Sequence, residues 1–113
     1  MGIFSTFMKG TDINEGLKVF NFTKGAMLID VRDAGEYGMG HIPGAVSMPL
    51  GVLEARSAEI KDKNTPIFVY CVTGARAGNA VKILNSKGFT KVTNIGGINS
   101  YKGQKEKDKG RSF

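Results

Sequence analysis

One cysteine offers the strongest nucleophile in this chain. Cys71 is the sole cysteine among 113 residues and directly follows an apolar run at residues 67–70. The loop after it is made mostly of small residues and ends in an arginine: Val72, Thr73, Gly74, Ala75 and Arg76. Backbone N–H groups in such a loop can converge on an anion, and the guanidinium adds a permanent positive charge. We therefore expect the loop to favour the nucleophilic thiolate of Cys71 and to hold a persulfide anion on the same sulfur.

The alternative interpretation of Cys71 is a small apolar side chain buried in the core. Its place after the clearest strand pattern, with Arg76 closing the loop, favours chemistry instead. The chain has no second cysteine to resolve a disulfide, so a thioredoxin-like dithiol cycle is excluded and a single-cysteine relay remains. A lone thiol is best kept reduced in the cytoplasm, which we therefore predict as the compartment.

Alternating strand and helix patterns must position this loop. Short apolar runs predict strands at residues 26–31, 45–48, 67–70 and 91–95, and helical spacing predicts helices from Asp12 to about Phe22 and at residues 50–60, 77–87 and 98–102. Glycines predict a loop or broken turn across residues 35–44. This alternation is typical of an α/β domain with a parallel sheet, in which ligands bind beyond the carboxyl ends of the strands. Cys71 stands at such an end.

The composition of the chain restricts the kinds of partner that we expect it to bind. The length and an apolar share of 41% suit one domain with a modest core. The formal charge is +6, but half of this excess falls in residues 102–111, and basic residues are not interleaved with aromatics before that segment. We therefore predict no nucleic-acid partner. An apolar run of the length that spans a membrane is also missing from the sequence, so we predict no membrane association.

Four motifs, in order, resemble those of the rhodanese family. They are residues 28–32 (LIDVR) with Glu36 and Tyr37, residues 40–45 (GHIPGA), Tyr70 and Cys71 with Gly74 and Arg76, and residues 96–98 (GGI). The resemblance implies a central parallel sheet flanked by helices on both faces, with a rhodanese-like domain at residues 1–103. The charge pattern separately predicts a polar, flexible tail at 104–113. The resemblance also implies a sulfurtransferase that moves sulfane sulfur through a persulfide on Cys71.

The same resemblance sets expectations for substrates and supporting residues. The donor would be a small sulfur-containing anion such as thiosulfate, and the acceptor a thiol, cyanide or a protein, with no metal or organic cofactor. Asp30 and Arg32 are expected to organise the site, and His41 to have an architectural role. Val72 is apolar where some thiosulfate-using relatives carry a cation, which leaves the preferred donor open. A first strand before Asp12 is not apparent in residues 4–9.

Three other functions remain as alternatives. A phosphatase or arsenate reductase of the same fold would use the cysteine and arginine, but their loop is longer by one residue than the stretch from Cys71 to Arg76. A rhodanese-like domain without activity would be a binding module, which retention of both residues disfavours. A persulfide carrier that delivers sulfur to one partner without rapid turnover lies between an enzyme and a binding module.

Overall fold

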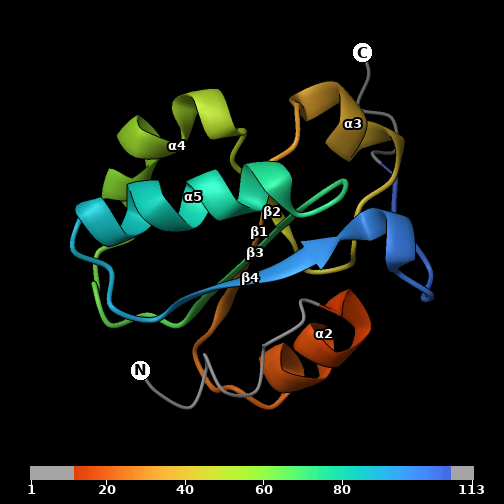
Figure 1. Ribbon diagram of the computed structural model, residues 1–113, viewed down its shortest axis with the longest axis horizontal. Coiled ribbons are helices and arrows are strands. Elements are labelled where there is room, and N and C mark those ends of the chain that lie inside the picture. The colour runs from red at the N-terminus through yellow and green to blue at the C-terminus, as the bar shows by residue number, and fades with distance from the viewer. Residues whose placement is uncertain (1–11, 108–113) are drawn as a thin grey trace.

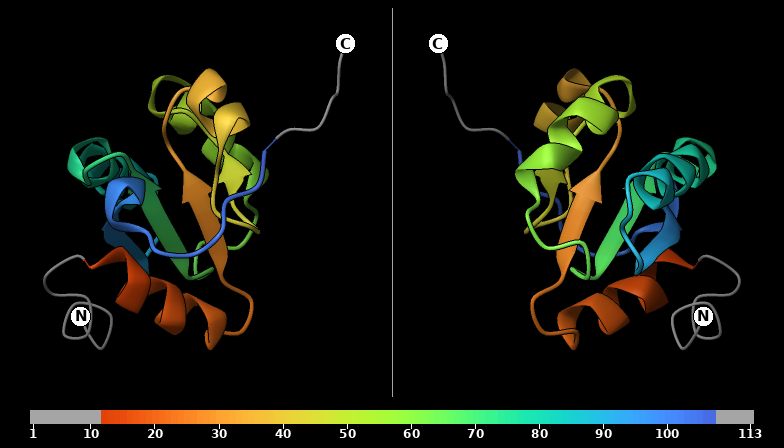
Figure 2. Two further views of the ribbon diagram at one scale, coloured as in Figure 1. Left: turned by 90° about the vertical axis from the view of Figure 1, so that its right-hand side faces the viewer. Right: turned by 90° about the vertical axis from the view of Figure 1, so that its left-hand side faces the viewer.

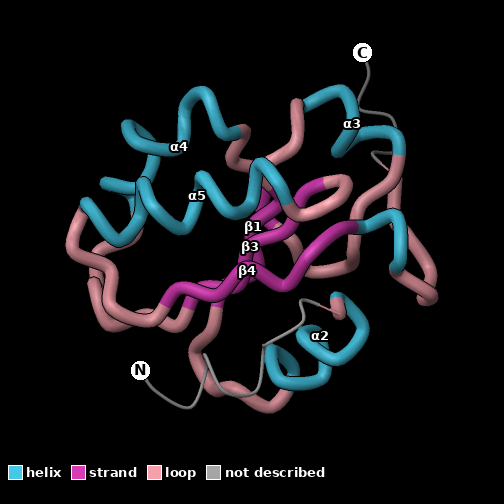
Figure 3. Tube along the Cα trace, viewed as in Figure 1, coloured by secondary structure: helices cyan, strands magenta, loops and turns pink. Residues whose placement is uncertain are grey.

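Four parallel strands form the centre of the fold. The computed structural model describes residues 12–107. Within that range the strands are β1 (Met27–Asp30), β2 (Val46–Ser47), β3 (Ile67–Cys71) and β4 (Val92–Gly97), which pair in the order β2-β1-β3-β4. Every pairing between them is parallel. The parallel sheet that the sequence predicts is therefore confirmed, and Figure 3 shows it enclosed by helices.

Helices cover both faces of this sheet. Helix α2 (Ile13–Asn21) lies against one face, and α4 (Leu50–Arg56) and α5 (Ala75–Ser86) lie against the other (Figure 1). Both views in Figure 2 show the same separation. Three shorter helices complete the described chain: α3 (Ala34–Met39), η1 (Ser57–Glu59) and η2 (Ile98–Ser100). The expectation of helices on both faces is thus confirmed.

Strand β3 divides the core into two clusters. Its side chains alternate between the faces, as the two-residue period of a strand requires. Val69 and Cys71 pack with the α4 and α5 side, whereas Phe68 and Tyr70 pack with the α2 side. All five residues of β3 are buried, which agrees with the continuous apolar pattern from which the strand was predicted. The sulfur of Cys71 consequently lies on the face that α5 covers.

Helix α3 corrects one sequence expectation. The glycines of residues 35–44 predicted a loop or broken turn, but residues 34–39 form a helix. A capping box explains the difference, because the backbone N–H of Asp33 donates to Glu36 Oε1 at 2.9 Å. This hydrogen bond stabilises the first turn enough to offset the low helix propensity of Gly35 and Gly38. The helix ends at Met39, with Gly40 as its C-cap.

Two further helix boundaries differ from the predicted ones. Helix α5 begins at Ala75, two residues before the predicted start at Ala77, because Gly74 takes a positive φ of 106° and turns the chain directly into the helix. The helix predicted at residues 50–60 ends at Arg56 and continues as the 3-10 turn η1. Helix α2 begins as predicted, with Asp12 Oδ1 accepting a hydrogen bond from Asn14 N at 2.9 Å.

The chain after η2 runs back along the body of the protein. The backbones of His41 and Glu106 exchange two hydrogen bonds, each of 2.8 Å, in an isolated antiparallel bridge. Of the predicted tail at 104–113, the structure describes residues 104–107; the rest of that segment and residues 4–9, where no strand was apparent, lie outside the described range. None of the helices between residues 12 and 107 has the length and apolar character needed to cross a membrane.

Candidate active site

Cys71 ends the central strand β3, and its sulfur lies in a small cradle of backbone N–H groups. Sγ accepts hydrogen bonds from Gly74 N at 3.0 Å and from Ala77 N at 3.3 Å. The side chain is only 1% exposed. The donors come from opposite ends of one turn, because Gly74 is the N-cap of α5 and Ala77 lies in its first turn. The sequence predicted converging N–H groups here, and the structure brings two of them onto the sulfur.

The rest of the loop offers further donors. The N–H groups of Thr73, Ala75 and Arg76 donate no hydrogen bond to another residue within 12–107. Ala75 and Arg76 are the first residues of α5, where a helix has no internal acceptor for its N–H groups. The positive end of the helix dipole adds to this effect. The Cys71 loop, which we define as residues 72–76, therefore suits an anion next to the buried sulfur.

An asparagine of strand β4 binds the Cys71 loop to this strand. Asn94 Nδ2 donates to the carbonyl of Gly74 at 3.0 Å, while its Oδ1 accepts from Gly96 N at 2.8 Å. Farther along, Asn99 N donates to the carbonyl of Val72 at 3.2 Å. The sequence interpretation missed Asn94. Its signal was a polar amide inside a strand pattern, directly before Ile95 and two glycines.

The two glycines of β4 let the loop approach this strand. Val69 pairs with Asn94 but Cys71 pairs with Gly97, so β4 carries one extra residue between these pairs and bulges. Gly96 takes a positive φ of 104° in this bulge. A Cβ on Gly97 would overlap the carbonyl of Val72 and lie 2.6 Å from Thr73 Cα. Only glycine fits there without moving the loop.

Arg76 is paired with a carboxylate from another helix. Its Nη1 donates to Glu36 Oε1 at 3.0 Å and its Nη2 to Glu36 Oε2 at 3.3 Å, and about a third of each side chain is exposed. The hydrogen bonds from Arg76 lower the pKa of Glu36, with help from Asp33 N, and those to Glu36 raise the pKa of Arg76. The negative charge of an ionised Cys71 also acts on Arg76. The sequence placed Arg76 at the loop but did not identify Glu36 as its partner.

Asp30 and Arg32 form a buried ion pair at the end of β1. Both oxygens of Asp30 accept from Arg32, with Nη2 at 2.7 Å from Oδ2, and Arg32 Nη2 also donates to the carbonyl of Gly40 at 2.7 Å. Asp30 is fully buried and Arg32 is 6% exposed. The hydroxyl of the neighbouring Tyr70 accepts from Ile42 N at 3.1 Å, and burial raises the pKa of Tyr70 strongly, with the charge of Asp30 acting in the same direction. Through Gly40, the pair connects the end of β1 to the start of the loop before β2.

His41 has contacts that support the architectural interpretation. Its Nδ1 lies 2.9 Å from the carbonyl oxygen of Tyr37, and the two rings stack with centroids 3.7 Å apart. Together with the backbone bridge to Glu106, these contacts hold the loop before β2. The contacts use the ring for packing against Tyr37.

An open cleft lies beside the Cys71 loop. It measures about 570 Å³ and is lined mostly by polar residues at the start of α2, in the loop and around η2: Asp12, Asn14, Val72, Thr73, Gly97, Asn99, Ser100 and Lys102. Asn14 joins two of these elements, because its side chain donates to the carbonyl of Ser100 at 2.8 Å and accepts from Lys102 N at 3.0 Å. In the part of the chain that the structure describes, no three His, Cys, Asp or Glu side chains gather into a group that could hold a metal ion.

Known proteins resemble this chain in sequence and in fold. Thiosulfate sulfurtransferase PspE of Escherichia coli is 41% identical over 71 residues, which are 62% of this chain and 68% of PspE. YrkF of Bacillus subtilis is 40% identical over 68 residues, or 60% of this chain, but the chain spans only 36% of YrkF. A solved structure described as a rhodanese with anions from E. coli superposes with a TM-score of 0.68 at 37% identity, covering 74% of this chain and 99% of that one. The model of the rhodanese-like domain family matches residues 15–104. The chain therefore belongs to the rhodanese-like domain family.

Proposed function

We propose that this protein is a sulfurtransferase that carries sulfane sulfur as a persulfide on Cys71. The observation that carries the proposal is the cradle of Gly74 N and Ala77 N around a cysteine sulfur at the end of the central strand. Such N–H groups stabilise negative charge on sulfur before and after transfer. The name of the PspE relative supports the same chemistry.

The first half of the reaction loads the cysteine. The Cys71 thiolate attacks the outer sulfur of a donor such as thiosulfate, a new S–S bond forms, and sulfite leaves with the electron pair of the broken bond. The charge then lies on the terminal sulfur of the persulfide. The free N–H groups of the Cys71 loop are placed to stabilise this charge, and Arg76 lies at the edge of the same loop.

The second half of the reaction removes the sulfur from Cys71. The thiolate of an acceptor, or cyanide, attacks the terminal sulfur, and Cys71 leaves as a thiolate that the same cradle stabilises. No net oxidation or reduction is needed, because one sulfane sulfur moves between two nucleophiles. We place this cycle in the cytoplasm, where a lone cysteine stays reduced between transfers.

A persulfide carrier is the second candidate. The YrkF relative bears the name of a sulfur carrier protein, and the shared chemistry would then end in delivery to a protein thiol. Carrier and enzyme differ in the unloading step alone. Rapid release to small thiols and cyanide would identify the enzyme, whereas release to one protein acceptor would identify the carrier.

The test is intact-protein mass spectrometry after brief treatment with thiosulfate, followed by cyanide. We expect the wild type to gain about 32 Da, one sulfur atom, and to lose it on addition of cyanide. The matched control is Cys71→Ser, which keeps the size of the side chain and removes the nucleophile. An unchanged mass of the wild type with thiosulfate and then with polysulfide would refute the proposal.

A further inference from the structure

We propose that Glu36 sets the charge preference for the sulfur donor: it disfavours doubly charged donors such as thiosulfate relative to singly charged ones. This inference rests on the proposed sulfurtransferase function. Glu36 acts through Arg76, the cation of the Cys71 loop, and is in this sense a positioning residue. The donor class that follows is a monoanion with a terminal sulfane sulfur.

Hydrogen bonds hold the carboxylate of Glu36 between its own helix, α3, and helix α5. Its Oε1 accepts from Asp33 N at 2.9 Å and from Arg76 Nη1 at 3.0 Å, while its Oε2 accepts from Arg76 Nη2 at 3.3 Å. The capping box holds the carboxylate on α3, and the two-pronged pair holds the guanidinium of α5 against it. Arg76 therefore meets an incoming donor with its charge already balanced.

The other charges near the Cys71 loop do not make up for the positive charge of Arg76 that Glu36 balances. Val72, Thr73 and Ala75 are uncharged, and the carboxylate of Asp33 also acts on Arg76. Arg32 acts on Glu36 but is itself paired with the buried Asp30. On the far side of the loop, Lys102 shares its cleft with the carboxylate of Asp12. Arg76 and Arg32 are thus each paired with a carboxylate, and Lys102 lines the same cleft as one.

Charge on the donor then decides how strongly it is attracted. The carboxylate of Glu36 repels a dianion about twice as strongly as a monoanion at the same place. Methanethiosulfonate is a suitable monoanion, because attack on its outer sulfur forms the same Cys71 persulfide and releases methanesulfinate. Its reaction differs from that of thiosulfate in the charge of the donor and leaving group, not in the sulfur that moves.

The experiment measures kcat/KM of the full chain for both donors, with cyanide as the common acceptor. Glu36→Gln removes the charge but keeps the length of the side chain and a carbonyl that can accept from Asp33 N. We expect the ratio of kcat/KM for thiosulfate to that for methanethiosulfonate to rise roughly five-fold, as removal of one nearby unit charge implies. We expect this change to shrink as KCl is raised, since salt screens exposed charges.

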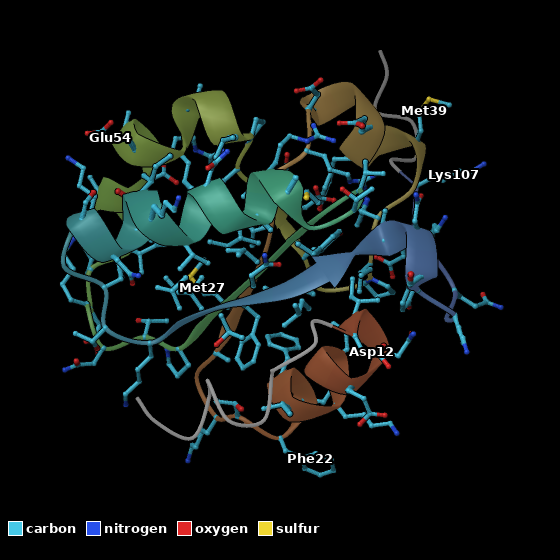
Figure 4. All side chains as sticks on the ribbon, in the orientation of Figure 1. Asp12, Phe22, Met27, Met39, Glu54 and Lys107 are labelled. Carbon is cyan, nitrogen blue, oxygen red and sulfur yellow. The ribbon has the colours of Figure 1, made fainter. Side chains whose placement is uncertain are left out.

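Glu54→Gln is the matched control. Glu54 pairs with Lys87 at the opposite end of α5, 3.1 Å away, and Figure 4 shows it on the other side of the molecule from Met39, the last residue of α3. We expect this variant to leave the ratio unchanged. A ratio unchanged in Glu36→Gln, or an equal loss with both donors, would overturn the inference while leaving the proposed function intact. If the wild type accepts sulfur from neither donor, the proposed function itself fails, and the inference with it.

Discussion

At the scale of single residues, the sulfur site depends on a glycine in the neighbouring strand. Gly97 has a φ of −128°, which any residue can adopt, so the requirement for glycine is one of space. A Cβ at this position would overlap backbone atoms of Val72 and Thr73, which cannot move aside as a flexible side chain can. The position of the loop, and with it the cradle around Cys71, is therefore set by the absence of a side chain in β4.

The substitution Gly97→Ala tests this dependence. We expect the loop to be displaced and the rate of persulfide formation to fall by about 100-fold, because small misplacements of a reacting group have effects of this order. The measurement is the rate of mass gain with thiosulfate. Gly51→Ala is the control, since a Cβ there meets nothing within 4 Å and alanine favours the helix α4. A wild-type rate in Gly97→Ala would show that the loop tolerates the extra atom.

At the scale of elements, the end of β1 is tied to the loop before β2 by the ion pair of Asp30 and Arg32. Removing one partner of a buried pair leaves the other charge without compensation, which costs about 3–5 kcal/mol. We expect Asp30→Asn to lower the free energy of unfolding by an amount of this order, measured by urea titration. Replacing both partners, as Asp30→Leu with Arg32→Met, removes both charges and is expected to destabilise less than Asp30→Asn alone.

Glu15→Gln provides the comparison for that prediction. Glu15 pairs with Lys18 at 3.2 Å on the outside of α2, where both side chains are well exposed. Such pairs contribute little to stability, so we expect no measurable change in the urea midpoint. If Asp30→Asn were as mild as Glu15→Gln, the buried pair would not be what holds the end of β1.

The sequence was most informative where a local pattern decides the structure. The apolar run before Cys71 predicted β3, and Asp12 predicted the start of α2, because strand burial and helix capping depend on a few neighbouring residues. It failed for α3, where one hydrogen bond between Asp33 and Glu36 outweighs the glycines. The contacts of Asn94 and the partner of Arg76 were also missed, since both join segments far apart in the chain.

At the scale of the whole molecule, the pair of Glu36 and Arg76 links α3 to α5 and so contributes to global stability as well as to the charge of the loop. Arg76 lowers the pKa of folded Glu36, so the ionised carboxylate favours the folded state. This contribution is fully present above the unfolded pKa of about 4.3 and is lost as the pH falls through the lower folded value. Its size is about 0.5 kcal/mol, because solvent screens a pair that is a third exposed.

We therefore expect wild type to exceed Glu36→Gln in free energy of unfolding by about 0.5 kcal/mol at pH 7, and expect this difference to vanish towards pH 3. The raised pKa of Arg76 acts only in strong alkali and leaves this window unaffected. The exposed pair of Arg56 and Glu59, in which Arg56 lowers the pKa of Glu59, titrates in the same acid range, but it is present in both proteins and cancels in the difference. Urea titrations at several pH values between 3 and 7 measure the difference directly. A difference that stayed constant over this range would assign the effect of Glu36 to packing, and the charge of the pair would then have no part in holding α3 to α5.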